Sequence, residues 1–559
     1  MTATTDARAA GRWLSQWAAP VRGLLAVSVL AGAVQALAMI LQLGLMAWFV
    51  DQLVAHNQRV SLIPIAAMLA LAILVRAGGQ WLQDRAGLRA GDRVRGQVRR
   101  ALLQAWQTAG PVGLKSSDSG RLASEWTEQV DALEGYYARY LPQMVLAVVV
   151  PLIVLIVVAA LDWLAALFLL VAAPLIPLFM ALVGMGAERI NQRHYESLAR
   201  LSGHFLDRLR GLTTLQLFGR SDDAVADVAG ATDDYRRLNM ATLRVAFLSS
   251  AVLEFFASVA IAAVAIYVGF GLLDMIGFGP ASGMTLFSGL FVLLLAPEFF
   301  QPLRLLSQYY HDRAAALGAA AHLMPRLAEP AEHAPGAAQA MGGGGEVGGI
   351  RVSNLSVVWP GRPPVFSNLE LNLAPGGTLV VTGASGVGKS TLLAVLAGFV
   401  TPQEGQVLVA GQPPGCQPVG WMGQRPWLVT GSWRENLRLT APDASDEAMR
   451  EALWKVGLEV VLDARPEGLD AHLGEGGLGI SGGQARRLAL ARLLLTPSPV
   501  MLLDEPTAGL DSTTEAEVVE ALRGILGDEE RTCVIATHQP ALKALADREL
   551  ALDTEAADG

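Results

Sequence analysis

The chain has 559 residues, of which 52% are hydrophobic and only 17% are charged, with a formal net charge of −9. This length is too great for one domain, and so apolar a composition excludes a wholly soluble protein. The acidic balance argues against a nucleic-acid-binding surface, which needs a basic patch. Only two cysteines occur, Cys416 and Cys533, which indicates a reducing compartment and no disulfide framework.

Six apolar runs predict helices that cross a membrane, which takes about 20 residues at the helical rise. The second run is short and the sixth carries Glu298 and Arg304, so a buried soluble helix is the alternative for these two. The runs are Leu24–Val50, Leu62–Val75 with an extension toward Trp81, Leu141–Leu161, Trp163–Gly186, Phe247–Leu273, and Ala281 to about Leu305.

Basic residues are distributed unevenly among the connections between these runs. The second and fourth connections are long and rich in arginine, whereas the first, third and fifth hold only Arg59. Because basic residues are retained on the cytoplasmic side, both termini are predicted to be cytoplasmic. The two long connections are predicted to be helical extensions of the spans, each with a break near its middle, at 109–120 and within 211–219. Such breaks could dock on a soluble domain, or each connection could be an ordinary solvated hairpin.

The chain is predicted to divide into four parts. Residues 1–23 form an N-terminal segment, 24–325 a transmembrane domain, 326–349 a linker, and 350–559 a second domain. The linker is rich in Ala, Pro and Gly and supports no packed core. The alternating stretches Ile350–Val358 and Phe366–Leu373 predict strands at the start of the second domain.

A glycine loop lies between an apolar strand, Thr378–Thr382, and an apolar helical run, Leu392–Phe399. Its G-x4-G-K-S pattern predicts a phosphate-binding loop, because glycines let backbone N–H groups turn inward and the helix N-terminus adds positive charge. A chance glycine-rich turn is the alternative, which the strand-to-helix context disfavours. The predicted nucleotide-binding residues are Gly383, Ser385, Gly386, Gly388, Lys389, Ser390 and Thr391, with Lys389 on the β- and γ-phosphates and Ser390 on Mg²⁺.

A second apolar strand, Val500–Leu503, ends in two carboxylates, Asp504 and Glu505. Ligands of α/β folds bind at the carboxyl edge of the sheet, where such residues would lie. Asp504 is predicted to hold Mg²⁺ through water, and Glu505 to polarise the water that attacks the γ-phosphate. The alternative is a merely solvated acidic strand end.

The run Ile480-Ser481-Gly482-Gly483-Gln484 resembles the signature of ATP-binding cassette proteins. The resemblance extends over the whole second domain and implies four further roles: Trp359 stacks on adenine, Gln424 is the Q-loop residue that contacts Mg²⁺, Asp511 belongs to the D-loop, and His538 is the switch histidine that contacts the γ-phosphate. It also implies that Ser481 acts on the ATP of another subunit, because cassette ATP sites form between the phosphate loop of one cassette and the signature of another.

The whole chain therefore resembles an exporter-type half-transporter. The implied fold is a six-helix transmembrane domain followed by an α/β P-loop ATP-binding cassette, with ATP and Mg²⁺ as its cofactors. Cassettes usually continue for another turn and helix after the strand that follows His538, and this chain stops soon after that strand, at Gly559.

Four stretches of the membrane part resemble CydD-type subunits of a bacterial exporter of thiol reductants: Tyr136–Met144, Pro174–Gly186, Leu201–Gly211 and Leu295–Pro302. This resemblance implies a heterodimer with a CydC-type partner in the cytoplasmic (inner) membrane, and export of cysteine and glutathione to the periplasm for cytochrome bd assembly. Haem is an alternative cargo, and a lipid or multidrug exporter is an alternative function of the same architecture. A regulatory ATPase that only docks on membranes is disfavoured by six apolar runs.

Two carboxylates, Glu254 and Glu298, lie within or at the ends of apolar spans. A carboxylate is costly there unless it faces a wet cavity or a partner, so both are candidate residues of a substrate cavity. The alternative is that both lie in cytoplasmic extensions of the helices and pair with Arg244 or Arg304.

Overall fold

The structure, a computed structural model, describes residues 2–56, 61–114, 119–174, 205, 208–209, 211–277, 279–328, 348–359, 361–424, 426–474, 479–528 and 531–552. The chain divides into two compact units. The first comprises Met1–Leu103 and Ser119–Ala328 and is helical. The second comprises Gln104–Asp118 and Glu329–Gly559 and contains all the described strands.

Five helices of the described residues are long and apolar enough to cross a membrane: Arg8–Val54, Leu62–Leu114, Tyr136–Leu161, Ala251–Leu272 and Leu286–Ala328. The fourth predicted span begins as a shorter apolar helix, Trp163–Pro174, and its remainder lies outside the described residues. The elements of the helical unit are α1 (Thr2–Ala18), η1 (Ala19–Val21), α2 (Arg22–Val54), α3 (Leu62–Leu114, which belongs to the second unit from Gln104 onward), α4 (Ser119–Ser124), η2 (Glu125–Gln129), η3 (Tyr136–Tyr140), α5 (Leu141–Leu161), α7 (Leu212–Leu217), α8 (Ser221–Leu272), η4 (Gly279–Gly283) and α9 (Leu286–Ala328).

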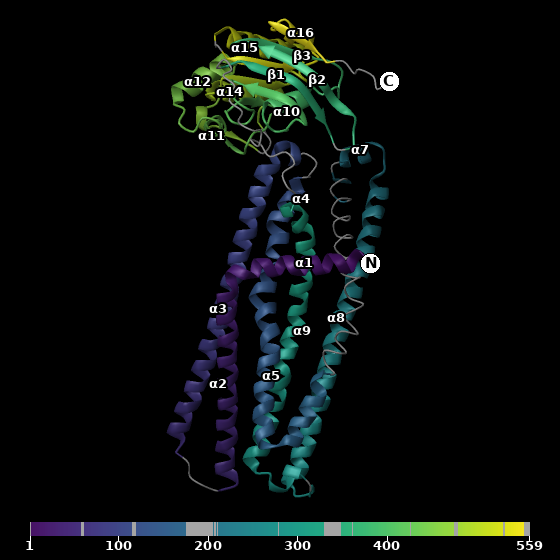
Figure 1. Cartoon of the computed structure of the whole chain (residues 1–559), viewed down its shortest axis with the longest axis vertical. Helices are drawn as coiled ribbons and strands as arrows, with labels where there is room; N and C mark the ends of the chain where they lie inside the picture. Colours follow the sequence, from purple (N-terminus) through teal and green to yellow (C-terminus); the bar gives the residue numbers. More distant parts are fainter. Residues whose placement is uncertain are drawn as a thin grey trace. The chain divides into compact units, whose positions relative to one another are not determined.

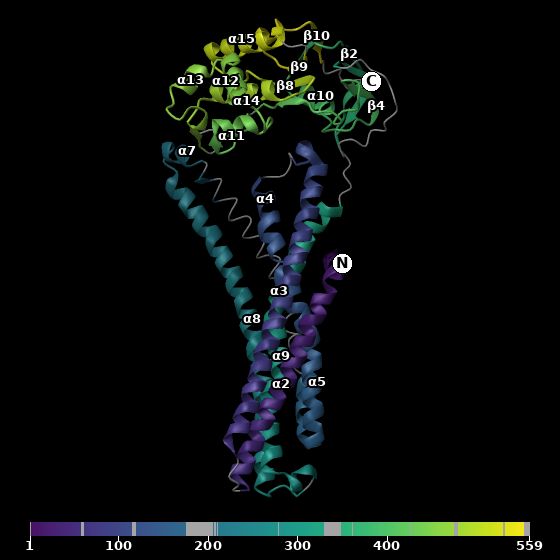
Figure 2. The same cartoon turned by 90° about the vertical axis from the view of Figure 1, so that its left-hand side faces the viewer.

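Helix α9 is the element around which the helical unit packs. It contacts α1, α2, α5 and α8, and it runs lengthwise beside α2 and α5 (Figures 1 and 2). Small residues permit this close approach: Ala47, Ala257 and Ala296 are fully buried. A Cβ on Gly289 of α9 would lie 2.9 Å from Val268 Cγ1 of α8. Packing of small residues is a common basis for helix association in a membrane, where water does not drive it.

Helix α1 was not anticipated as a separate element in the predicted N-terminal segment. It lies across the bundle (Figure 1) and packs against α9. Its Ala10 and Leu14 are buried, and the Tyr137 hydroxyl donates a hydrogen bond of 2.7 Å to the Leu14 carbonyl oxygen. The segment is therefore anchored to the helical unit by an amphipathic face.

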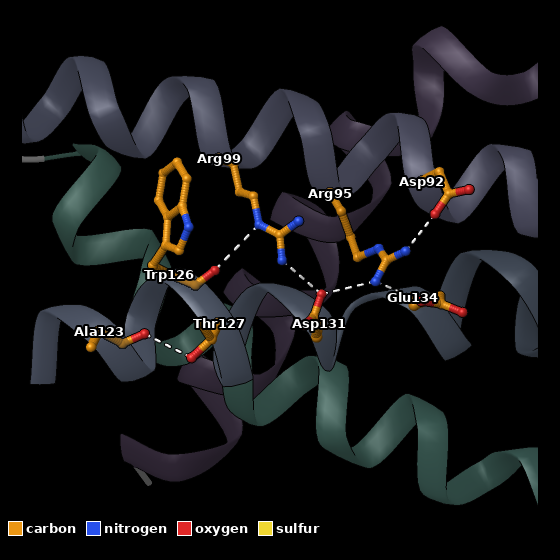
Figure 3. Close-up of polar contacts among 8 residues, drawn as sticks. All are labelled: Asp92, Arg95, Arg99, Ala123, Trp126, Thr127, Asp131 and Glu134. Carbon is orange, nitrogen blue, oxygen red and sulfur yellow. Dashed lines mark hydrogen bonds and ion pairs between the residues drawn. The ribbon is translucent and has the colours of Figure 1, made fainter. Parts of the chain in front are cut away.

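The long connection after the second span is helical, as predicted, and α3 continues as far as Leu114. Its charged part is held by ion pairs to the segment 125–134 (Figure 3). Arg95 Nη1 lies 2.8 Å from Asp131 Oδ1 and 2.7 Å from Glu134 Oε2, and Arg99 Nη2 lies 2.8 Å from Asp131 Oδ1. The predicted breaks are present at Gly110, with φ of 64°, and at Gly219, with φ of 65°, which separates α7 from α8.

The α/β unit contains three described sheets. An antiparallel sheet has the order β2-β1-β4, a parallel sheet the order β10-β3-β9-β8-β5, and a small one pairs β6 with β7. Their strands are β1 (Ile350–Val358), β2 (Pro364–Leu373), β3 (Thr378–Thr382), β4 (Glu404–Val409), β5 (Gly420–Met422), β6 (Gly431–Ser432), β7 (His472–Leu473), β8 (Val500–Asp504), β9 (Thr532–Ala536) and β10 (Arg548–Ala551).

Every residue of β3, β8 and β9 is buried, which explains why these strands are continuous apolar runs without alternation. Helices accompany the sheets: α10 (Lys389–Leu396), α11 (Trp433–Arg438), α12 (Asp446–Lys455), α13 (Glu459–Asp463), η5 (Gly468–Asp470), α14 (Gly482–Leu495), α15 (Ser512–Asp528) and α16 (Pro540–Lys543). Helix α10 contacts both β8 and β9, so it covers the centre of the parallel sheet.

Candidate functional site

Three neighbouring parallel strands bring the predicted chemical groups to one edge of the sheet. In the register of β3, β9 and β8, Ala536 is paired with both Val381 and Asp504. The residues that follow these strands, Gly383, Glu505 and His538, therefore leave the sheet at the same edge. This carboxyl edge is where α/β folds bind ligands.

The loop between β3 and α10 depends on glycine at three positions. Gly383, Gly386 and Gly388 have φ of 142°, 86° and 115°, a backbone conformation that side chains rarely allow. A Cβ on Gly383 would also lie 2.5 Å from the Leu552 carbonyl oxygen, and one on Gly388 would collide with Val365 of β2. The chain therefore needs glycine at these three positions to form a tight loop that can hold phosphate through its backbone N–H groups.

Lys389 is the first residue of α10 and is buried at 6% exposure. Its Nζ donates hydrogen bonds to the carbonyl oxygens of Gly383 (2.8 Å) and Ala384 (2.9 Å), so the ammonium lies over the loop. Ser390 and Thr391 follow in the same first turn, both partly buried, and Ser385 is exposed. One cation and a helix N-terminus thus meet at the loop, an arrangement that attracts phosphate.

Glu505 adopts a left-handed backbone with φ of 49°, which is unusual for a residue with a side chain. Its N–H donates to the Ala536 carbonyl oxygen (2.9 Å), and its Oε1 lies 3.2 Å from Nδ1 of His538. Strained backbone of this kind is concentrated at functional sites. The carboxylate and the imidazole can together orient a water molecule for attack.

Two further groups reach the same edge. Gln424 lies two residues beyond β5, whose Met422 is paired with Leu503 of β8, and Asp504 ends β8 and is buried. With Ser390, they provide hydroxyl, amide and carboxylate oxygens from three separate segments. Oxygen donors of this kind suit Mg²⁺, which usually retains waters and binds few protein ligands beside substrate phosphates. The donor set at this edge therefore fits that ion.

The signature residues form the start of α14. Ser481 Oγ accepts a hydrogen bond from the Gln484 N–H (3.2 Å), and Gln484 Oε1 accepts one from the Ser481 N–H (2.9 Å), which is a capping box. A Cβ on Gly483 would collide with Thr514 of α15, whereas one on Gly482 would meet nothing within 4 Å. Gly483 is thus required by packing, and Gly482 is open to an approaching group.

Comparison with known proteins gives two family matches. The profile described as the ABC transporter transmembrane region matches residues 25–297, and the profile described as ABC transporter matches residues 366–508. The glutathione/L-cysteine transport system ATP-binding/permease protein CydD of Escherichia coli is 41% identical over 96% of this chain and 92% of its own length. The chain belongs to the CydD-type branch of the ABC transporter family.

Two other relatives cover most of this ABC transporter chain. The transport ATP-binding protein AarD of Providencia stuartii is 39% identical over 94% of this chain and 90% of its own length. The glutathione/L-cysteine transport system protein CydC of Bacillus subtilis is 34% identical over 86% of this chain and 83% of its own length. Membership of the family establishes an ATP-hydrolysing transporter subunit with a transmembrane region followed by a cassette.

The structure also shows the local contacts of two other predicted site residues of the cassette, Asp511 and Trp359. Asp511 caps α15: its carboxylate accepts hydrogen bonds from the N–H groups of Thr513 (3.1 Å) and Thr514 (3.0 Å) and from the Thr514 hydroxyl (2.8 Å). These bonds, those from Thr514 above all, lower the pKa of Asp511. Trp359 is partly buried just after β1 and packs against the hydrophobic core that includes residues of β1 and β2. Its stacking on adenine stays a prediction.

Arg486 is a residue of this edge that the sequence interpretation missed. It lies two residues beyond Gln484 in α14, and its Nη2 donates to the Gln424 carbonyl oxygen (3.3 Å). Burial lowers the pKa of Arg486, although the negative charge of Glu505 acts in the opposite direction. No motif marked this arginine, but the Ser-x-x-Gln pattern of residues 481–484 could have predicted the capping box.

The two candidate carboxylates of the membrane part have different surroundings. Glu298 lines a cavity of about 350 Å³ between α2, α3, α5 and α9. Glu254 is not among the residues that line it, and its Oε2 lies 3.2 Å from Arg304 Nε. The alternative of an ion pair with Arg304 therefore describes Glu254, and only Glu298 faces the cavity.

Proposed function

We propose that this chain is one half of an ATP-driven exporter that moves small thiols, cysteine and glutathione, from the cytoplasm to the periplasm and supports cytochrome bd assembly. The observation that carries the proposal is the 41% identity, over nearly the whole chain, to a relative named for glutathione and L-cysteine transport. Because this identity covers the membrane unit as well as the cassette, it concerns the cargo path and not only the ATPase.

In this proposal the sheet edge binds and hydrolyses ATP. Trp359 stacks on adenine, the loop 383–388 and Lys389 hold the phosphates, and Glu505 polarises the attacking water. His538, 3.2 Å from Glu505, orients that carboxylate and contacts the γ-phosphate. Ser390, Gln424 and Asp504 would hold a Mg²⁺ ion, which would supply positive charge beside the phosphates.

The second proposal concerns the partner. Gly482 has open space at its Cα, and the N–H groups of Gly482 and Gly483, at the start of α14, have no intrahelical acceptor, whereas the Gln484 N–H is bonded to Ser481 Oγ. These groups suit the γ-phosphate of a nucleotide bound by another chain. The resemblance to CydD, together with relatives named as CydC of a glutathione/L-cysteine transport system, supports a CydC-type half-transporter as the partner in a heterodimer, in which each cassette completes the other's ATP site.

In this proposal the heterodimer lies in the bacterial inner membrane with both termini cytoplasmic. Support comes from the arginine-rich second and fourth connections, such as the α3 extension with Arg95 and Arg99. The other connections contain no lysine and only one arginine, Arg59. The cassette follows the last span and would lie on the cytoplasmic side, where ATP is available.

The purified heterodimer provides the test of the proposed function. Its ATPase rate should rise with cysteine or glutathione and change little with a lipophilic drug. Stimulation by haem alone would replace the thiol cargo by haem, and stimulation by the drug alone would favour a multidrug or lipid exporter. This chain without its partner should be a poor ATPase, and a monodisperse, fully active homodimer would contradict the partner requirement.

A further inference from the structure

The cavity of about 350 Å³ in the helical unit lies between helices that are long and apolar enough to cross a membrane, and polar and charged side chains share its lining with apolar ones. Its lining contains one guanidinium, Arg76, and two carboxylates, Asp84 and Glu298. Among the described residues none of these three groups forms an ion pair. An unpaired charge beside membrane spans is costly unless it faces water or a ligand, so these groups indicate a binding site.

The lining residues are arranged as stripes on four helices. Arg76, Gln80 and Asp84 recur every four residues along one face of α3, and Glu298 and Gln301 lie one turn apart on α9. Arg76 and Asp84 are therefore separated by about 12 Å along the axis of α3. The charges are therefore spread along the cavity instead of being gathered at one point.

Two interhelical hydrogen bonds fix the walls. The Ser28 hydroxyl of α2 donates to the Gln83 carbonyl oxygen of α3 (3.0 Å), and the buried Gln143 of α5 donates through Nε2 to the Pro302 carbonyl oxygen of α9 (2.9 Å). A Cβ on Gly32 of α2 would lie 2.8 Å from Gln83 Oε1, so glycine allows this close approach. The cavity is thus held open by specific contacts and is not a packing defect.

Helix α9 offers an additional acceptor. Pro302 has no N–H, so it cannot donate the usual helical hydrogen bond to the carbonyl of Glu298, four residues earlier. An ammonium group has three donors and needs several acceptors. Glu298 is half-buried whereas Asp84 is exposed, so the Glu298 carboxylate would attract an ammonium more strongly.

We propose that this cavity recognises the zwitterionic amino-acid end of the cargo and not its sulfur. Glu298 binds the α-ammonium, Arg76 the α-carboxylate, and the glutamine side chains of the walls the remaining polar groups. Both cysteines of the chain lie outside the helical unit, so no thiol of this chain meets the cargo there. The inference rests on the proposed function and adds a specificity to it: thiol-free amino acids of similar size should also bind.

Haem is the main competing occupant. The lining includes Met39 and Tyr309, residue types that ligate haem iron, and Arg76 could pair with a propionate. Two carboxylates would repel propionates, however, and a lining rich in amides suits a polar ligand better than an apolar macrocycle. The mixed charge of the cavity therefore favours a small zwitterion.

The test uses inside-out vesicles that contain the heterodimer and labelled cysteine. Competitors are S-methylcysteine, which keeps both charges but blocks the thiol, cysteamine, which lacks the carboxylate, and N-acetylcysteine, which lacks the ammonium. S-methylcysteine should compete about as well as cysteine, and the other two about tenfold more weakly, the value of one charged hydrogen bond. Equal competition by the two other thiols, with none by S-methylcysteine, would mean that sulfur is recognised and would overturn the proposal.

Two variants connect this preference to the cavity. Arg76→Gln should abolish the preference for S-methylcysteine over cysteamine, which lacks the carboxylate. Glu298→Gln should abolish the preference for S-methylcysteine over N-acetylcysteine, which lacks the ammonium. Matched controls are Arg85→Gln, an exposed arginine of α3 that does not line the cavity, and Glu254→Gln, and both should keep each preference. If both cavity variants keep the wild-type preferences, the cavity is not the recognition site. If both variants lose only the stimulation of ATP hydrolysis by haem, the cavity binds haem instead.

A second readout separates this inference from the proposed function. S-methylcysteine should stimulate ATP hydrolysis by the purified wild-type heterodimer, and the Arg76→Gln and Glu298→Gln variants should lose that stimulation while basal hydrolysis persists. If S-methylcysteine stimulates hydrolysis but vesicles take up no cysteine, the proposal of thiol export fails and the proposal of a zwitterion site stands. If vesicles take up cysteine but S-methylcysteine does not stimulate hydrolysis, the proposal of thiol export stands and the proposal of a zwitterion site fails.

Discussion

The sheet edge of the cassette and the cavity of the helical unit present their functional groups in different ways. At the edge, strand ends and left-handed glycines fix the positions, and Glu505 and His538 lie within 3.2 Å of each other. In the cavity, isolated charges come from α3 and α9, with no ion pair between described residues. In our proposals the edge carries out one reaction on one ligand, whereas the cavity selects among ligands. Substitutions at the edge should therefore abolish turnover, and substitutions in the cavity should change only what is carried.

The largest effect is expected at Glu505. Glu505→Gln keeps the shape of the side chain but removes the carboxylate, so hydrolysis by this site should fall by about 10³-fold while ATP binding persists. The measurement compares single-turnover hydrolysis with binding of a fluorescent ATP analogue, in a heterodimer whose other site is also disabled. Hydrolysis at the wild-type rate would refute the assignment of Glu505.

Lys389→Ala should act on binding itself. The substitution removes the only cation that the described structure places over the phosphate loop, and charged hydrogen bonds of this kind predict an affinity about 100-fold lower. A titration with the ATP analogue measures the change. Lys543→Ala serves as control, because that lysine pairs with Glu549. Equal loss in both variants would point to general damage.

The two signature glycines offer a contrast between stability and activity. Gly483→Ala places a methyl group against Thr514 and should cost about 1–3 kcal/mol of cassette stability, seen as a lower melting temperature. A methyl group at position 482 meets open space, so Gly482→Ala should change the free energy of unfolding of the cassette by no more than about 1 kcal/mol. The same substitution should nevertheless lower the ATPase rate of the heterodimer. Normal ATPase in Gly482→Ala would argue against a nucleotide at this helix start.

The smallest effect is expected where charges of the helical unit are already paired. Asp131 bridges Arg95 and Arg99 (Figure 3), and its side chain is half-exposed, so Asp131→Asn should change stability by less than about 1 kcal/mol. Cargo preference should stay the same, in contrast to Arg76→Gln. A thermal melt measures the stability, and the competition assay measures the cargo preference. A shift in cargo preference would contradict the view that only the unpaired charges of the cavity select the cargo.

The sequence predicted the edge better than the cavity for a physical reason. Strands β3 and β8 are continuous apolar runs that end in recognisable residues, so the loop at 383–391 and the carboxylates 504–505 were placed correctly at strand ends. The spans were predicted by hydropathy, although the end of the fourth lies outside the described residues. Local patterns of this kind depend on neighbours in the chain.

The parts that could not be predicted depend on contacts between distant segments. The cavity combines stripes from four helices, and a stripe such as Arg76, Gln80 and Asp84 also suits an ordinary solvated helix face. The sequence likewise offered no basis to separate Glu254, which pairs with Arg304, from Glu298. The packing of α1 through Leu14 and Tyr137 is a similar case, because it joins residues more than 100 positions apart.

The central claim is that ATP hydrolysis by this chain and its partner moves a small thiol across the membrane. Inside-out vesicles with the wild-type heterodimer should accumulate labelled cysteine or glutathione only when ATP is present, and vesicles in which the chain carries Glu505→Gln should accumulate far less. Vesicles that hydrolyse ATP but gather no thiol, while haem is moved or alone stimulates turnover, would contradict the claim.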